Sequence, residues 1–99
     1  MEQSLRKLLN AILTSGAQYI AVEDTQKLVI KSDNVDKIIE AMTGGDEEFT
    51  LYCMESGDLP MGEIIIQPYK SKEDMIVNYS DNNFCDHVIV KFNKGDMND

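Results

Sequence analysis

The stretch Glu63-Ile64-Ile65-Ile66-Gln67 places three β-branched aliphatic residues in a row, directly before Pro68. A strand with one face in water alternates apolar and polar residues, so three consecutive isoleucines predict a strand covered on both faces. Similar runs occur on either side of it, at 49–54, 75–79 and 87–92. We therefore predict a sheet in which 63–67 is a central strand.

Apolar residues at helical spacing predict two amphipathic helices in the first half of the chain. The first runs from about Ser4 to Ser15, with Ser4 as its N-cap and Gly16 as a left-handed C-cap. The second covers 35–42, follows three successive N-cap candidates and ends before Gly44-Gly45.

Between the two helices the period of the apolar residues changes to two, which predicts a hairpin over 18–30. The polar segment 23–26 is its turn. One face of the hairpin should carry Ile20, Val22, Leu28 and Ile30, and the other Tyr19, Ala21 and Val29.

The connections after residue 48 are too short for crossover helices, so each later strand should pair antiparallel with its neighbour. The predicted order is α-β-β-α-β-β-β-β: an α+β fold with two amphipathic helices packed on a largely antiparallel sheet. We expect one domain over residues 1–99, with a frayed tail from about 94 to 99.

The chain is strongly acidic, with 18 Asp and Glu against 9 Lys and Arg and a net charge of −9. Direct binding to nucleic acid or to an anionic membrane is therefore not expected, because both depend on clustered cations. No apolar run approaches the roughly 18 residues that cross a bilayer, and two cysteines are too few for a secreted disulfide framework. We expect a cytoplasmic protein with reduced thiols.

Candidates for catalysis or metal binding are few. Cys85 and His87 would share one face of a strand but lack an oxyanion-hole motif. Adding Cys53 would give three zinc ligands, yet two strands of the predicted meander separate it from the others. The segment 81–86 lacks the glycine and terminal glutamate of a calcium loop, and we interpret it as a hairpin turn. We expect no enzyme activity, no metal and no cofactor.

Two features favour binding to a protein. The first is a set of carboxylates in predicted loops, which can face a basic groove: Asp46, Glu47, Glu48, Glu55, Asp58, Glu73 and Asp74. The second is the row that strand alternation places away from the helices, which would be an apolar interface if nothing covers it: Tyr52, Ile65, Ile76 and Ile89.

In size and acidity the chain is similar to the small inhibitors that phages and mobile elements make against nucleic-acid-binding defence enzymes, the anti-CRISPR and anti-restriction proteins. This is a resemblance of type and carries no residue roles. It implies a protein-binding module that occupies a basic nucleic-acid-binding site on its target by nucleic-acid mimicry. The alternative is a homo-oligomeric structural or accessory protein, such as a homodimer, that associates through the apolar sheet face.

Overall fold

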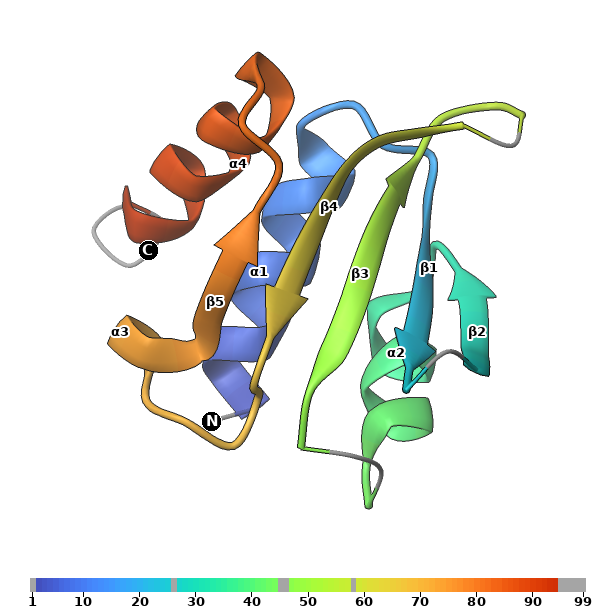
Figure 1. Ribbon diagram of the computed structural model, residues 1–99, viewed down its shortest axis with the longest axis vertical. Coiled ribbons are helices and arrows are strands. Elements are labelled where there is room, and N and C mark those ends of the chain that lie inside the picture. The colour runs from blue at the N-terminus through green and yellow to red at the C-terminus, as the bar shows by residue number, and fades with distance from the viewer. Residues whose placement is uncertain (1, 26, 45–46, 58, 95–99) are drawn as a thin grey trace.

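The computed structural model describes residues 2–25, 27–44, 47–57 and 59–94. They form a five-stranded antiparallel sheet in the order β2-β1-β3-β4-β5 (Figure 1). The elements are α1 Glu2–Thr14, β1 Tyr19–Asp24, β2 Lys27–Ser32, α2 Val35–Met42, β3 Phe49–Met54, β4 Pro60–Ile66, α3 Lys72–Met75, β5 Ile76–Tyr79 and α4 Asn83–Lys94. The predicted α+β class and antiparallel sheet are confirmed.

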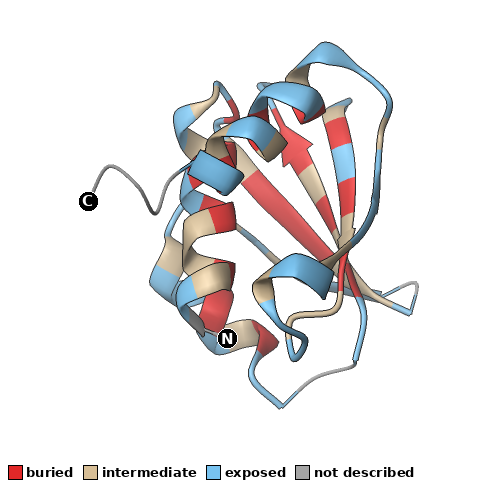
Figure 2. Ribbon diagram, turned by 90° about the vertical axis from the view of Figure 1, so that its left-hand side faces the viewer, coloured by how far each residue is buried: buried red, intermediate tan, exposed pale blue. Residues whose placement is uncertain are grey.

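The three longer helices pack on the same face of the sheet. Helix α1 contacts both α2 and α4, while α2 lies against β2 and α4 lies against β4. Seen from the side, the buried residues lie where the helices meet the strands (Figure 2). The described part of the chain buries no polar or charged residue there, so the core is held by apolar packing.

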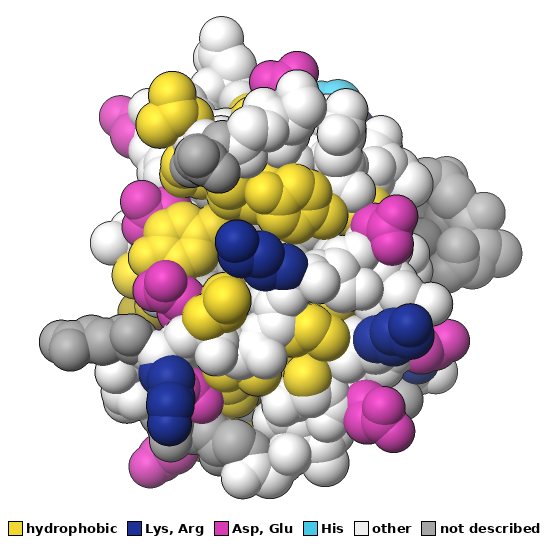
Figure 3. All heavy atoms as spheres, turned by 90° about the vertical axis from the view of Figure 1, so that its right-hand side faces the viewer, with side chains coloured by type: hydrophobic (Ala, Val, Ile, Leu, Met, Phe, Trp, Pro, Cys, Tyr) yellow, Lys and Arg dark blue, Asp and Glu magenta, His cyan; other side chains and the backbone are white. Residues whose placement is uncertain are grey.

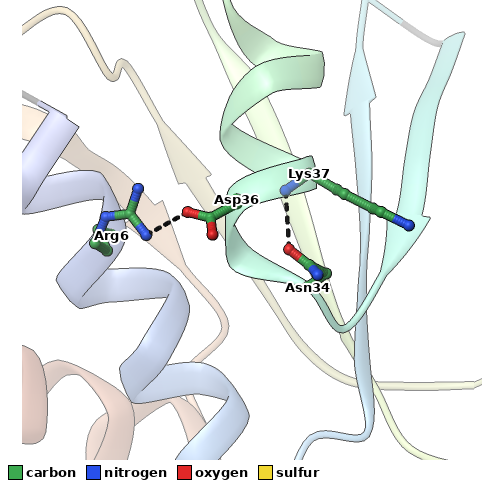
Figure 4. Close-up of polar contacts among 4 residues, drawn as sticks. All are labelled: Arg6, Asn34, Asp36 and Lys37. Atoms are coloured by element: carbon green, nitrogen blue, oxygen red, sulfur yellow. Dashed lines mark hydrogen bonds and ion pairs between the residues drawn. The ribbon is translucent and has the colours of Figure 1, made fainter.

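Both predicted N-terminal helices are present, although one predicted cap is wrong. Helix α1 begins at Glu2, so Ser4 lies inside it, whereas Gly16 follows it with a φ of +124°. Asn34 caps α2, because its side chain accepts a hydrogen bond from the Lys37 amide at 3.1 Å (Figure 4). Arg6 of α1 reaches Asp36 of α2 at 2.7 Å and joins the two helices at the surface.

The predicted hairpin is confirmed with two corrections to its faces, one of which concerns Val29, which was predicted on the outer face but packs against the core. Ile20, Val22 and Ile30 face the helices, but Leu28 lies opposite Glu23 and is 51% exposed. The pairing shifts register between Val22 and Glu23, so one extra residue of β2 is accommodated there. A bulge of this kind moves every residue beyond it to the other face.

The run of three isoleucines is wrongly predicted as the central strand covered on both faces. The central strand is β3, and β4 lies between it and the short β5. Ile64 and Ile66 are fully buried under the helices, whereas Ile65 points to the other face and is only half-buried. The run therefore belongs to a strand with one covered face.

The predicted last strand, 87–92, is wrong, because this segment lies in α4. Asn82 starts the helix, since its side chain accepts a hydrogen bond from the Cys85 amide at 2.9 Å. Cys85, Val88 and Phe92, spaced three and four residues apart, are all buried on one stripe. The single turn α3 also interrupts the predicted strand 75–79, which leaves β5 four residues long.

Candidate functional site

The face of the sheet opposite the helices, here called the open face, is the candidate site. Strand pairing arranges its side chains in two rows across the sheet. The first row runs Lys31, Ala21, Tyr52 and Glu63, and the second runs Leu28, Glu23, Thr50, Ile65 and Asn78. These residues alternate along β1, β3 and β4 with the residues of the core.

Tyr52 lies near the middle of the open face, between two carboxylates. Its hydroxyl donates a hydrogen bond to Glu23 Oε1 at 3.1 Å, and Glu63 is its cross-strand neighbour on β4. Partial burial, the hydrogen bond to Glu23 and the charges of Glu23 and Glu63 together raise the pKa of the Tyr52 hydroxyl. Two carboxylates therefore lie beside the phenol, and their charge would attract a cation.

None of the helices in the described ranges packs on the open face. Figure 3 views the molecule from the β2 edge of the sheet, where hydrophobic side chains gather around one basic side chain and both acidic and basic side chains lie around them. Leu28 is 51% exposed at this side, and Tyr52 and Ile65 are half-buried. Apolar surface with a charged margin is typical of a protein interface.

The predicted apolar row is divided between the two faces. Tyr52 and Ile65 lie on the open face as predicted. Ile76 of β5 instead pairs with Ile66 and packs against the core, and Ile89 lies on α4. Together with Phe92, these two isoleucines line a hollow of about 320 Å³ between β5 and α4. The prediction for Ile89 is wrong because it treated α4 as a strand. The prediction for Ile76 is wrong because the register between β4 and β5 shifts between Ile65 and Ile66, which puts Ile76 beside the core-facing Ile66.

The described members of the predicted acidic set lie at opposite ends of the sheet. Glu47 and Glu48 precede β3, while Glu55 follows it, and a strand of six residues spans about 20 Å. Glu48 accepts a hydrogen bond from Gln67 Nε2 at 3.1 Å, and the Gln67 amide donates to Met75 O at 2.8 Å, so α3 shares the Glu48 end.

The hydrogen bond from the Gln67 backbone amide to Met75 O places Glu73 and Asp74 of α3 at the same end of the sheet as Glu48. Glu55 is separated from them by more than the Debye length of about 8 Å at physiological salt. Asp46 and Asp58 lie outside the described residues. Two carboxylates, Glu23 and Glu63, flank Tyr52, and neither was among the predicted site residues. Alternation along β1 does place Glu23 on the face away from the core, because its neighbour Val22 faces the core.

The predicted catalytic and metal candidates do not come together. Cys85 is buried and His87 is exposed, because residues two apart on a helix point in different directions. Within the described ranges, no group of three or more His, Cys, Asp or Glu could hold a metal ion. The segment 81–86 caps a helix and is not the predicted hairpin turn.

The two cysteines are closer than the predicted topology allowed. Cys53 of β3 pairs with Gly62 of β4, and a Cβ built on Gly62 would lie 2.5 Å from Cys85 Sγ. Both thiols are free and buried on the helix-covered face, where burial raises the pKa of Cys53 to about 12 and also raises that of Cys85. A high pKa keeps both sulfurs protonated and poorly nucleophilic.

No helix in the described part of the chain is both long and apolar enough to cross a bilayer. Comparison with protein-family models, with curated proteins and with solved structures found no match for this chain.

Proposed function

We propose that this chain is a non-enzymatic protein-binding module that docks its open face on a basic surface of a partner protein. The partner class that fits is a nucleic-acid-binding protein, whose own site is basic, and the chain would act in the cytoplasm as an inhibitor of that site. The observation that carries the proposal is Tyr52 held between Glu23 and Glu63 on a sheet face that no described helix covers.

The chemistry of this face suits arginine or lysine side chains. A guanidinium can stack on the Tyr52 ring while Glu23 or Glu63 accepts its hydrogen bonds, and such contacts combine cation–π attraction with charge-assisted hydrogen bonding. The half-buried Ile65 and exposed Leu28 supply apolar area beside them. A net charge of −9 would also speed the encounter with a basic partner.

Self-association through the same face is less well supported by the charges. In a twofold dimer the open face of one chain meets the open face of the other, which brings Glu23 and Glu63 toward the same carboxylates of the second chain. Two chains that each carry −9 also repel one another over a distance set by salt. A basic partner of a different kind would avoid both the repulsion between facing carboxylates and the repulsion between two acidic chains.

The test is a titration with an arginine-rich peptide, followed by amide chemical shifts and calorimetry. The variant Glu23→Gln with Glu63→Gln should weaken binding about tenfold, because it removes the carboxylates that flank Tyr52. The matched control, Glu40→Gln with Glu73→Gln, removes the same charge from α2 and α3 and should weaken binding by less than about threefold.

Tyr52 offers a second pair of matched variants. Tyr52→Phe keeps the aromatic face and should bind the peptide nearly as well as the unmodified chain, whereas Tyr52→Leu loses the cation–π contact and should bind several-fold more weakly. Equal losses in the open-face and control variants would mean that the charge acts only as a diffuse field for solubility. A dimer in sedimentation that Ile65→Lys dissociates would favour self-association instead.

A further inference from the structure

Helices α1 and α4 enclose a groove whose charge is opposite to that of the chain. Its volume is about 490 Å³, within the range of small-molecule sites. Three cations line it, Arg6 and Lys7 of α1 and Lys91 of α4, and no carboxylate is among the described residues that do so. A cationic lining stands out in a chain with twice as many acidic as basic residues.

The sequence of α1 places the polar part of this lining along one side of the helix. Gln3, Lys7, Asn10 and Thr14 follow one another at intervals of three or four residues. Ala11 and Phe92, both almost fully buried, form the apolar floor. The groove is thus a strip of hydrogen-bonding groups beside a short apolar base.

Two of the cations are held in position by neighbouring groups. Lys91 Nζ donates to Thr14 O at 3.1 Å and to Thr14 Oγ1 at 3.0 Å, which fixes its ammonium at the C-terminal end of α1. Arg6 is fixed near the other end by Asp36, 2.7 Å from its Nη1. From Arg6 to Thr14 the helix rises by about 12 Å, so the cations are spread along the groove, and Asp36 offsets part of the charge at the Arg6 end.

We infer that this groove binds a small ligand with several linked phosphate groups. One orthophosphate could contact only one end of a strip of this length, whereas a chain of phosphates can contact the cations at both ends and the Asn10 side-chain amide between them. The chain as a whole carries a net charge of −9, so anion binding depends on these local cations and should weaken as salt rises. This site lies on α1 and α4 and does not depend on the open face.

The experiment is a titration of the folded chain with tripolyphosphate at low and physiological salt, read by amide chemical shifts. Saturable shifts should be confined to α1 and α4, and orthophosphate should bind at least about tenfold more weakly, because it cannot span the strip. A parallel titration with adenosine triphosphate separates the possible sources. If adenosine triphosphate and tripolyphosphate bind with equal affinity, the groove recognises the phosphates alone. If adenosine triphosphate binds more tightly, its base also contacts the apolar floor.

The variants Lys7→Gln and Lys91→Met should each weaken tripolyphosphate binding by about three- to tenfold. Lys31→Met removes the same charge from β2, outside the groove, and should leave affinity within about twofold. Lys91→Met also removes the contacts to Thr14, so a thermal melt checks its fold, and Lys7→Gln carries the test if it does not fold. Shifts that are not saturable, or equal losses in Lys31→Met and Lys7→Gln, would overturn the inference.

Discussion

Adjacent residues of β3 and β4 lie on opposite faces of the sheet and in different surroundings. Cys53 and Ile64 face the helices and are completely buried, while their neighbours Tyr52 and Ile65 face outward and are only half-buried. The helix-covered face contains no buried polar or charged residue among the described ones, whereas the open face mixes aromatic, aliphatic and charged side chains. We infer that one face determines stability and the other is available for recognition.

The largest expected effect comes from truncating adjacent isoleucines on the two faces. Ile64→Ala should lower the free energy of unfolding by roughly 2 to 5 kcal/mol, because it removes buried methyl groups and leaves a cavity. Ile65→Ala should lower it by no more than about 1 kcal/mol, since that side chain is half-buried at the surface. Denaturant unfolding of the two variants measures both values.

Similar losses in Ile64→Ala and Ile65→Ala would contradict the comparison, because they would mean that something covers both faces. A chain that self-associates through the open face would behave in this way. Repeating the Ile65→Ala measurement over a range of protein concentrations separates the two cases, since only stability that comes from association changes with concentration.

A smaller effect is expected where α4 crosses β4. Gly62→Ala places a Cβ 2.5 Å from Cys85 Sγ. This distance is too short for two non-bonded atoms, so the buried sulfur must move away. We expect a loss of about 1 to 3 kcal/mol from this overpacking, and part of it should be recovered when Cys85→Ala removes the sulfur. The double-mutant cycle, measured by chemical unfolding, isolates the coupling between the two positions.

Gly57 is a suitable control for this cycle. It has a φ of +104° and open space around its position, so Gly57→Ala should destabilise through backbone strain alone. Cys85→Ala should not recover that loss. Additive effects of Gly62→Ala and Cys85→Ala would mean that α4 does not lie on β4 as described.

Much of the fold follows from local signals that agree with one another. The spacing of Leu8, Leu9 and Ile12 in α1, the Asn34 cap of α2 and the alternation in β1 all predict elements that the structure contains. Segment 87–92 is rich in β-branched residues and predicts a strand, yet the Asn82 cap and the packing of its apolar stripe on β4 make it helical. Tertiary contacts decided this element.

The candidate site was predictable only in part, for the same reason. Tyr52 and Ile65 followed from the alternation of β3 and β4, but the partners of Tyr52 depend on which strands are neighbours. A simple meander does not place β1 beside β3, so Glu23 could not be assigned to Tyr52. Lys91 could not be assigned to the groove while its segment was interpreted as a strand.

The smallest expected effect is a difference in pH dependence between adjacent residues of β3. Burial raises the pKa of Cys53 from 9.0 to about 12, so folding favours the protonated thiol. This contribution to stability is complete below pH 9, falls as the unfolded thiol ionises and ends near pH 12. At pH 10 the loss should be about 1 kcal/mol, and Cys53→Ala should remove this part of the alkaline slope.

Tyr52 provides the comparison, because its pKa is raised as well but its side chain lies on the open face. Its contribution is likewise complete below pH 10 and declines above it, yet solvent at the surface screens the charges of Glu23 and Glu63. Tyr52→Phe should therefore change the alkaline slope less than Cys53→Ala does, and its effect should shrink further in high salt. Urea unfolding at intervals from pH 8 to pH 11 gives both slopes. A larger or salt-insensitive effect at Tyr52 would mean that this ring is shielded from water, and that the open face is covered when the protein is in solution.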